Sequence, residues 1–378
     1  MTTLQQKEKK VEYLELIYDL IFVYIIGRNN SLLHHVESGF VTGEIFLAYV
    51  LCTLAVIQIW NFSTFYINLY GRNGARDHVF LCLNMFFLYF MADGTSAQWQ
   101  DSLYKYAAAW ALILANIGTQ HLIELRNHNN APWEIKQLKR KAAIILIEAA
   151  LVGVHILVYA LTGVSIAYVP VLFGIAAMLI SGKRNKLVPV DFAHLTERAM
   201  LYVVFTFGEM IIAIATYFSG DLSFNTVYFA AMAFLIVVGL FLSYGTMYNK
   251  IINRETETNG VNYMALHIFL IFALNNISVS LEFMREEEVS LLPKTLFLTV
   301  SFLVYFTFLF LIGRYAKRCC AFRGRFVLTL AAIGAAFSAL MLLFREIMYV
   351  NIAVTVLFVF GIFLLIYKQS KYASDEES

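Results

Sequence analysis

Charged side chains are scarce in this chain: they make up 14% of its residues, whereas hydrophobic residues make up 60%. A soluble domain has about 25% charged and roughly 45–50% apolar residues. The shortage of charge therefore argues against an ordinary soluble domain and favours helices that face lipid. The net charge of +2 gives no reason to expect a nucleic-acid partner.

Cysteine is also rare, and the motifs of familiar enzymes are missing. Two of the 4 cysteines, Cys52 and Cys82, lie in apolar runs, where a thiol behaves as a small hydrophobe. Cys319 and Cys320 are adjacent, beside a basic loop. The sequence has no zinc-type Cys or His spacing, no phosphate-binding loop, no nucleophile elbow and no dinucleotide fingerprint. We expect ordinary reduced cysteines, no cofactor and no metal.

A cleavable signal peptide is not evident either. The first apolar run carries Glu12, Glu15 and Asp19, and it lacks a cleavage site of small residues. We expect this run to be the first membrane helix, retained in the mature protein.

Long apolar runs dominate the chain, and they predict an all-α, polytopic membrane protein. A bilayer crossing needs roughly 20 apolar residues. Scanning with that length gives about twelve candidate transmembrane helices, of which the third and sixth are short. They are residues 11–36, 42–70, 78–94, 102–123, 141–162, 165–181, 194–218, 222–248, 261–284, 291–313, 325–344 and 348–368.

The basic residues predict the orientation of these spans. Most of the 28 Lys and Arg residues fall in the loops on the side of the N-terminus. Loops rich in Lys and Arg stay in the cytoplasm, so twelve spans with both termini cytoplasmic are expected. The five basic residues predicted on the opposite side are Arg28, Lys105, Arg285, Lys294 and Arg345.

A polar break after six spans, at residues 183–189, divides the chain into two predicted halves. The N-terminal six-helix half is 1–186 and the C-terminal six-helix half is 187–378. Each half begins with an acid-bearing helix followed by an aromatic-rich one. With six spans apiece the halves share one orientation, which predicts parallel repeats with a substrate site at their interface.

Two carboxylates, Asp19 and Glu209, lie in the middle of apolar, membrane-length segments at comparable places in the two halves. An acid in hydrocarbon costs roughly 2.5–3.5 kcal/mol on insertion scales, so it usually faces a partner or a water-filled path. We predict one polar path between the halves that contains both acids.

The first span carries a polar stripe roughly 33 Å long, enough to cross the hydrocarbon. Arg28 points nearly the opposite way, so it needs a partner elsewhere or extends toward the membrane surface. Two other interpretations stay open: Glu12 and Glu15 could lie at a solvated helix end, and Asp19 could have a purely structural role. At about 100° per residue the stripe contains Glu12, Glu15, Asp19, Asn30 and His34.

Other candidate residues lie in the second, fifth and seventh spans. Residues 194–218 carry a stripe with Arg198, Tyr202, Glu209 and Thr216, preceded by His194 and Glu197. The last two could be an ordinary helix start or two ligands of a metal, but no second such motif is present. The second span contributes Trp60, Tyr66 and Asn68, and the fifth carries Glu148 and His155 on one face, where they would extend the path.

Three motifs carry a resemblance to a known family. They are Glu15-Leu-Ile-Tyr-Asp19-Leu-Ile-Phe-Val-Tyr24, Trp60-x5-Tyr66-x-Asn68 and His194-x2-Glu197-Arg198-x9-Gly208-Glu209. Their sequence, order and separation resemble those of the bacterial low-temperature-requirement protein A (LtrA) family. The segment Ser243–Tyr248 departs from the family pattern, so an acid of the second half is missing there. The resemblance implies a multi-pass protein of the bacterial inner membrane that is linked to growth in the cold, and it supplies no molecular activity.

Four kinds of function fit these features, one of which is a channel. Parallel halves, paired intramembrane acids and missing catalytic motifs favour transport of a small solute or ion, with proton coupling as an option. A membrane-embedded enzyme acting on lipid would use Glu12, Glu15, His194 and Glu197 as acid–base groups. A structural or regulatory membrane protein is the third. The expected partners are the lipid bilayer and an unidentified solute or ion, with no nucleic acid, and the oligomeric state stays open.

Overall fold

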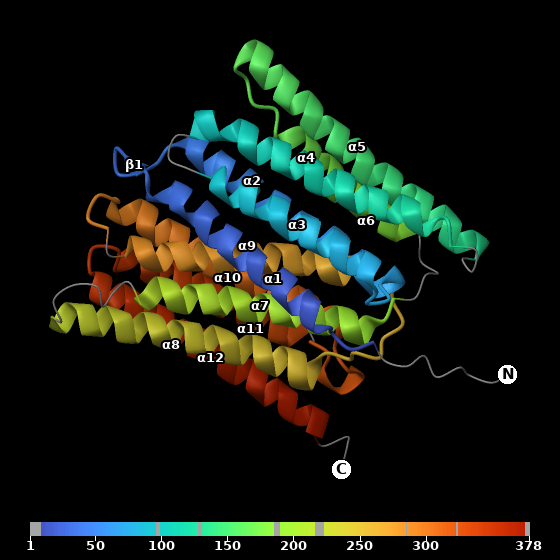
Figure 1. The fold of residues 1–378 in the computed structure, drawn as a ribbon. Coiled ribbons are helices and arrows are strands. Elements are labelled where there is room, and N and C mark those ends of the chain that lie inside the picture. The colour runs from blue at the N-terminus through green and yellow to red at the C-terminus, as the bar shows by residue number, and fades with distance from the viewer. Residues whose placement is uncertain are drawn as a thin grey trace. The chain divides into compact units, whose positions relative to one another are not determined.

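The computed structural model describes residues 9–95, 99–127, 131–184, 190–215, 223–284, 286–322 and 324–374. Twelve α-helices occupy most of these described residues (Figure 1). The chain forms two compact units. Unit 1 comprises Met1–His35, Thr42–Leu201 and Glu257–Met264, and unit 2 comprises Val36–Val41, Tyr202–Thr256 and Ala265–Ser378.

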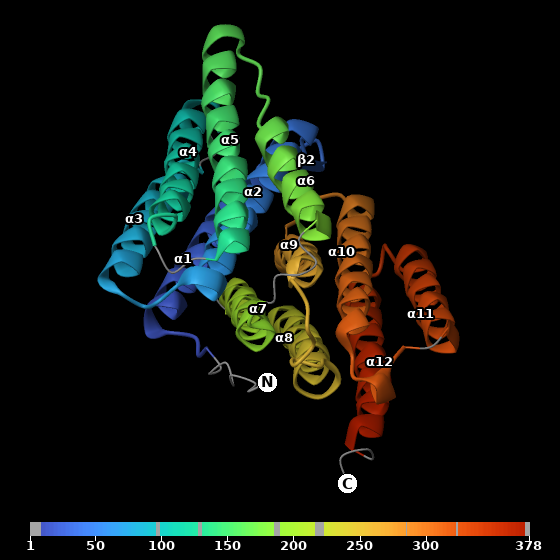
Figure 2. The same cartoon turned by 90° about the vertical axis from the view of Figure 1, so that its right-hand side faces the viewer.

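Unit 1 is a bundle in which α4 packs against α3 and α5, α1 contacts α2 and α3, and α6 packs against α2 and α5 (Figure 2). The first turns of α7 and the first turn of α9 (Val261–Phe283) also belong to unit 1. Its elements are α1 (Tyr13–Asn30), the 3-10 helix η1 (Ser31–His34), α2 (Gly43–Tyr70), α3 (Ala75–Asp93), α4 (Trp99–Glu124), α5 (Pro132–Thr162), α6 (Tyr168–Arg184) and the start of α7 (Phe192–Ala215).

Capping residues set the helix ends in unit 1. The Thr42 hydroxyl accepts from the Ile45 amide and begins α2. Pro132 occupies the first turn of α5, where its missing N–H costs nothing. Gly163 ends α5 at φ 69°, a left-handed conformation that glycine adopts without strain.

The interior of unit 1 is formed largely by α2, and much of it is polar. In addition to its apolar side chains, α2 buries a series of uncharged polar ones. Buried polar groups need partners, so their neighbours on α1, α5 and α7 decide what this interior can do. The series is Thr53, Gln58, Asn61, Ser63, Thr64 and Asn68.

Unit 2 contains a short hairpin and the remaining helices. The strands β1 (Val36–Glu37) and β2 (Phe40–Val41) pair antiparallel, with Val36 opposite Val41. The other elements are the rest of α7, α8 (Phe224–Thr246), the π-helix η3 (Met247–Ile251), α9 (Val261–Phe283), α10 (Leu291–Ile312), the 3-10 helices η4 (Gly313–Tyr315) and η5 (Arg318–Cys320), α11 (Gly324–Leu343) and α12 (Met348–Ser374). Within this unit α12 packs against α8 and α11, and α10 against α11.

Each of the twelve predicted spans coincides with one helix of the structure. The largest difference is in α5, which begins at Pro132 rather than residue 141, because its first turns are polar and a hydropathy scan passes over them. Among the described residues, 8 helices are long and apolar enough to cross a membrane: α2, α5 and all of α7 to α12. The chain is therefore a helical multi-pass membrane protein. The predicted boundary between halves, at 186 and 187, lies outside the described residues.

Candidate functional site

The candidate site is built around Arg198, on the first turns of α7, which is completely buried in unit 1. Its Nε and Nη2 atoms donate to Asp19 of α1, at 3.1 Å to Oδ2 and 2.5 Å to Oδ1. Its Nη1 atom donates to Oε2 of Glu15 at 2.6 Å. One guanidinium thus holds two carboxylates from successive turns of α1, using a planar fork that lysine lacks.

Trp60 adds a third helix to this arrangement. Its indole Nε1 donates to Oδ1 of Asp19 at 2.9 Å. Asp19, Trp60 and Arg198 are each 0% exposed and Glu15 is 3% exposed, so the charges are removed from solvent. We call Glu15, Asp19, Trp60, His194 and Arg198 the Arg198 cluster. It joins α1, α2 and the start of α7 through side chains alone.

His194 is positioned by the chain just before α7. Asp191 is the residue before the helix, and its Oδ1 accepts from the His194 amide at 3.0 Å, as an N-cap residue does. Asn68 of α2 binds the Asp191 backbone twice: its Nδ2 donates to the carbonyl at 2.8 Å, and its Oδ1 accepts from the amide at 3.2 Å. These two bonds fix which end of the Asn68 amide is the donor.

The fixed amide of Asn68 also determines the state of His194. The Asn68 Nδ2 group is a donor and lies 3.0 Å from Nδ1 of His194, so that ring nitrogen accepts. A histidine that accepts at Nδ1 is neutral and carries its proton on Nε2. This Nε2 lies 3.4 Å from Oε2 of Glu15, so the neutral ring directs its proton toward that carboxylate.

The cluster therefore carries an unequal charge. With a neutral His194, two carboxylates face one guanidinium, so the cluster itself sums to one negative charge, and the Lys9 ammonium that interacts with Glu15 lies outside the cluster. A buried ion pair recovers its desolvation cost only with good geometry and further hydrogen bonds. Asp19 has such bonds, from Arg198 and Trp60, whereas Glu15 shares Oε2 between Arg198 and the more distant His194.

A polar cavity of about 660 Å³ adjoins this carboxylate. Glu15, Asn68 and Asp191 line it, together with Lys9 and Glu12, whereas Asp19 does not. Lys9 crosses it: its backbone amide donates to Asp191 at 2.9 Å, and its ammonium donates to the carbonyls of Gly71, at 2.8 Å, and Ile67. The cavity connects the cluster, through Glu15, to a space that can hold water.

The other predicted residues of unit 1 lie outside the cluster. Arg28 donates to the Thr95 carbonyl at 3.4 Å, after α3, and Asn30 is buried at the end of α1. Glu12 is half-buried at the N-cap of α1, and Glu197 is half-buried beside Arg198. Tyr66 accepts from Arg76 at 3.2 Å rather than contacting the cluster.

Tyr202 and Glu209 belong to unit 2, although they lie on the same helix as Arg198. Tyr202 is 0% exposed, and Glu209 is half-buried, where the charge of Glu282 on α9 acts on it. Thr216, the last residue of the predicted stripe, lies outside the described residues.

The structure also brings together charged residues that sequence reasoning missed. Glu124, at the end of α4, binds Arg72 at 3.0 Å and Arg76 at 2.6 Å. Asp191 and Lys9 are further omissions. Asp191 could have been found as the N-cap signal three residues before His194. Within the described residues, no group of three or more His, Cys, Asp or Glu side chains could hold a metal ion.

Comparison with known proteins assigns the family. A search of curated proteins and a search of solved structures each found no match. The family model for the bacterial low temperature requirement A protein (LtrA) matches residues 10–360, nearly the whole chain. That range contains all three of the motifs and the complete Arg198 cluster. The chain therefore belongs to the bacterial low temperature requirement A protein (LtrA) family.

Proposed function

We propose that this LtrA family protein transports a small solute or ion, and that protonation of the Arg198 cluster drives the transport. The observation that carries the proposal is the charge of the cluster: two buried carboxylates, one guanidinium and a neutral histidine beside a polar cavity. A site that is one positive charge short of neutrality favours uptake of a proton or a cation. Intramembrane ionisable residues of this kind mark substrate and proton pathways in other membrane proteins.

Glu15 is the proposed entry point for the proton, because it lines the cavity and Asp19 does not. A protonated Glu15 no longer attracts Arg198 by charge, so the guanidinium retains Asp19 as its anionic partner. Loss of the proton restores the second ion pair. The two bonding states of Arg198 thus give a two-state element, and a ligand that prefers one state shifts the population toward it.

The proposal includes a membrane arrangement. Twelve crossings with both termini in the cytoplasm would form two parallel six-helix halves in the bacterial inner membrane, and the path would join Asp19 to Glu209. The distribution of Lys and Arg supports the orientation, and the matching sequence positions of the two acids support the path. Reporter fusions after Lys183 and Arg318 should report the cytoplasm, and fusions near Asp101 and Asp221 the exterior. An exterior signal at Lys183 would overturn the arrangement.

The activity is tested with the full chain reconstituted in vesicles that contain a pH-sensitive dye. A panel of ions, amino acids and sugars is added outside, and both solute uptake and internal pH are followed. We expect one class of solute to enter together with a pH change in the wild type. Glu15→Gln should remove the pH change, and Glu44→Gln, an exposed acid at the start of α2, should keep it.

Two results would contradict the proposal. If no solute or ion enters with any wild-type preparation that is folded, a structural or regulatory role becomes the better explanation. If uptake is normal in Glu15→Gln at every pH, transport occurs without this cluster. Turnover of added lipid by the wild type would instead indicate a membrane-embedded enzyme.

A further inference from the structure

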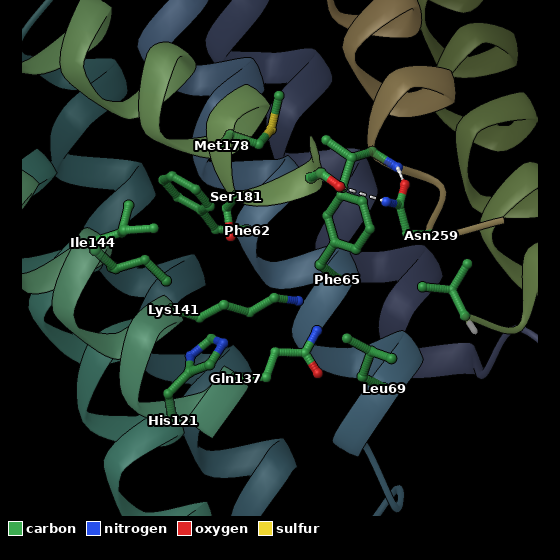
Figure 3. A pocket seen from close by; sticks show the side chains of 14 residues that line it. Phe62, Phe65, Leu69, His121, Gln137, Lys141, Ile144, Met178, Ser181 and Asn259 are labelled. Carbon is green, nitrogen blue, oxygen red and sulfur yellow. Dashed lines mark hydrogen bonds between the residues drawn. The ribbon is translucent and has the colours of Figure 1, made fainter. Parts of the chain in front are cut away.

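A second pocket in unit 1, mostly apolar with a few polar side chains, lies apart from the Arg198 cluster, between α2, α4, α5 and α6 (Figure 3). It is a pocket of about 60 Å³, and its polar lining includes Lys141, Gln137, His121 and Ser181. A cavity needs about 10–15 Å³ in this measure to hold one water molecule. The pocket therefore has room for a small cluster of atoms, such as a carboxylate or a phosphate group.

Lys141 places an ammonium group in this pocket without a counter-charge. Its Nζ lies 5.0 Å from the centre of the Phe65 ring, and Figure 3 shows the side chain extending from α5 toward that ring. Among the residues that the structure describes, no carboxylate lies within 4.0 Å of Nζ. A cation–π contact compensates only part of the loss of water around an ammonium, so the site favours an anion.

Neighbouring groups add further donors to the same pocket. Tyr70 donates to Oε1 of Gln137 at 3.1 Å. The other atom of this amide is therefore the nitrogen, which is a donor. Figure 3 shows this nitrogen on the side of the Lys141 ammonium. Nδ1 of His121 donates to the Ile117 carbonyl at 2.9 Å, so in the neutral ring Nε2 is an acceptor and His121 adds no donor to the pocket. The Ser181 hydroxyl, which lines the pocket, can donate as well.

The rest of the lining is apolar or already bonded. Asn259 donates to the Gly182 carbonyl at 2.8 Å and accepts from the Val261 amide at 3.1 Å, so it closes one side rather than binding a ligand. The remaining walls are hydrocarbon and aromatic, supplied by Phe62, Ile144 and Met178 among others. Donors at one point with apolar walls around them suit a ligand with an anionic group and a hydrophobic part.

We infer that this pocket binds an oxyanion, a phosphate or carboxylate group, on Lys141 and Gln137, and that an anionic amphiphile supplies it. Lys141 follows the basic residues Lys136, Lys139 and Arg140 on α5, which the positive-inside pattern assigns to the cytoplasmic end. Acidic lipid head groups are found at this level of the inner leaflet, and basic pockets between helices bind them. The inference is independent of the transport proposal, since none of these residues belongs to the Arg198 cluster.

The test compares the wild type with Lys141→Gln and with Lys139→Gln, whose lysine is exposed on the same helix. The purified full chain is titrated with phosphatidylglycerol, with diacylglycerol of the same tails, or with inorganic phosphate. Retained lipid is counted by native mass spectrometry, and thermal unfolding is measured in each case. We expect phosphatidylglycerol to bind the wild type and Lys139→Gln alike, and to bind Lys141→Gln about tenfold or more weakly, since a charged hydrogen bond is lost.

The arms distinguish the source of the oxyanion. Protection by phosphatidylglycerol alone supports a lipid, and equal protection by inorganic phosphate that depends on Lys141 supports a soluble oxyanion at the same site. Equal binding of phosphatidylglycerol and diacylglycerol, with no effect of phosphate on the wild type, would overturn the inference. If Lys141→Gln does not fold, Gln137→Leu and the wild-type comparison of the two lipids still decide the result.

Discussion

The two units bury different kinds of polar group. All buried carboxylates among the described residues, which are Glu15, Asp19, Asp77, Glu124 and Glu148, belong to unit 1. Unit 2 buries mainly hydroxyl and amide groups, and its half-buried acid Glu209 has the acid Glu282 as a charged neighbour. Charge is thus concentrated in the interior of unit 1, whereas most of the described helices that are apolar enough to cross a membrane belong to unit 2.

The direction of the hydrogen bonds differs as well. In unit 1 many side-chain bonds run between helices, as from Trp60 to Asp19 and from Gln58 to Glu148, at 2.9 and 3.2 Å. In unit 2 most hydroxyls bond to a carbonyl one turn earlier in their own helix, as Ser243 does to Gly239 at 2.7 Å. Bonds between helices fix the register of their partners, whereas bonds within a helix do not. Unit 1 is therefore the more sensitive to side-chain changes.

The largest effect is expected from Arg198→Met. The substitution leaves Glu15 and Asp19 buried without their cation, and breaking a buried ion pair costs about 3–5 kcal/mol. We expect poor yield of folded protein and a large fall in thermal stability, measured on the purified chain in detergent. Ser243→Ala in unit 2 is the comparison and should stay near the wild type. Similar losses in both variants would remove the proposed difference between the units.

A second substitution examines helix contacts in unit 1. A Cβ atom at Gly174 of α6 would lie 1.6 Å from Nε2 of Gln58 and 2.3 Å from Oε2 of Glu148. Gly174→Ala should therefore displace the buried Gln58 and Glu148 side chains and disturb the hydrogen bond between them, at about 1–3 kcal/mol for overpacking. In α12 of unit 2, a Cβ atom at Gly361 meets nothing within 4 Å. Gly361→Ala should be neutral or stabilising in the same unfolding assay, and a loss equal to that of Gly174→Ala would contradict this account.

Much of unit 1 could be predicted from the sequence because local patterns determine it. Hydropathy located every helix, and the angular stripe of α1 identified Glu15 and Asp19, which are buried. The sequence placed Arg198 on the polar stripe of α7, but it does not determine which acids Arg198 binds, since the ion pairs join residues about half the chain apart. Lys141 is the first residue of the predicted span 141–162, and the sequence pattern does not single it out. Pro132, a helix-start signal, would have placed it on α5, seven residues before Glu148 and on the same face.

A smaller effect distinguishes the two central acids. Asp19→Asn keeps the shape but removes the charge that two bonds from Arg198 neutralise, so it should destabilise the protein measurably. Glu209→Gln should change stability by only about 0.6 kcal/mol, the average for an interhelical hydrogen bond in membranes. Unfolding temperatures of the two variants give the comparison.

The same pair of variants also tests the proposed shared path. If Glu209 lies on it, solute uptake should fall in both variants even though only Asp19→Asn unfolds more easily. Normal uptake by folded Glu209→Gln at several pH values would confine the functional charge to unit 1, and the difference between the units would then be sharper than proposed.

The smallest expected effect concerns Lys9, which precedes α1 and borders the cavity beside Glu15. Burial lowers the pKa of its ammonium from the ordinary value of 10.5, and the charges of Glu15, Asp77 and Asp191 oppose that shift. Between the lowered pKa and 10.5 the unfolded chain binds more protons than the folded one, so stability must rise with pH in that window. This stabilisation is complete above pH 10.5 and is lost as the pH falls through the lowered pKa of Lys9.

This sign predicts a difference between Lys9→Gln and the wild type. As the pH is raised toward 10.5, the wild type should gain stability relative to Lys9→Gln, measured as a difference in unfolding temperature at each pH. The exposed neighbour Lys10 provides the control, and Lys10→Gln should follow the wild type through the same range. A wild-type curve that stays parallel to that of Lys9→Gln would show that the ammonium is as well solvated in the folded protein as in the unfolded chain. The cavity beside Glu15 would then be open to water throughout, and the charge of the Arg198 cluster would be less isolated than its burial indicates.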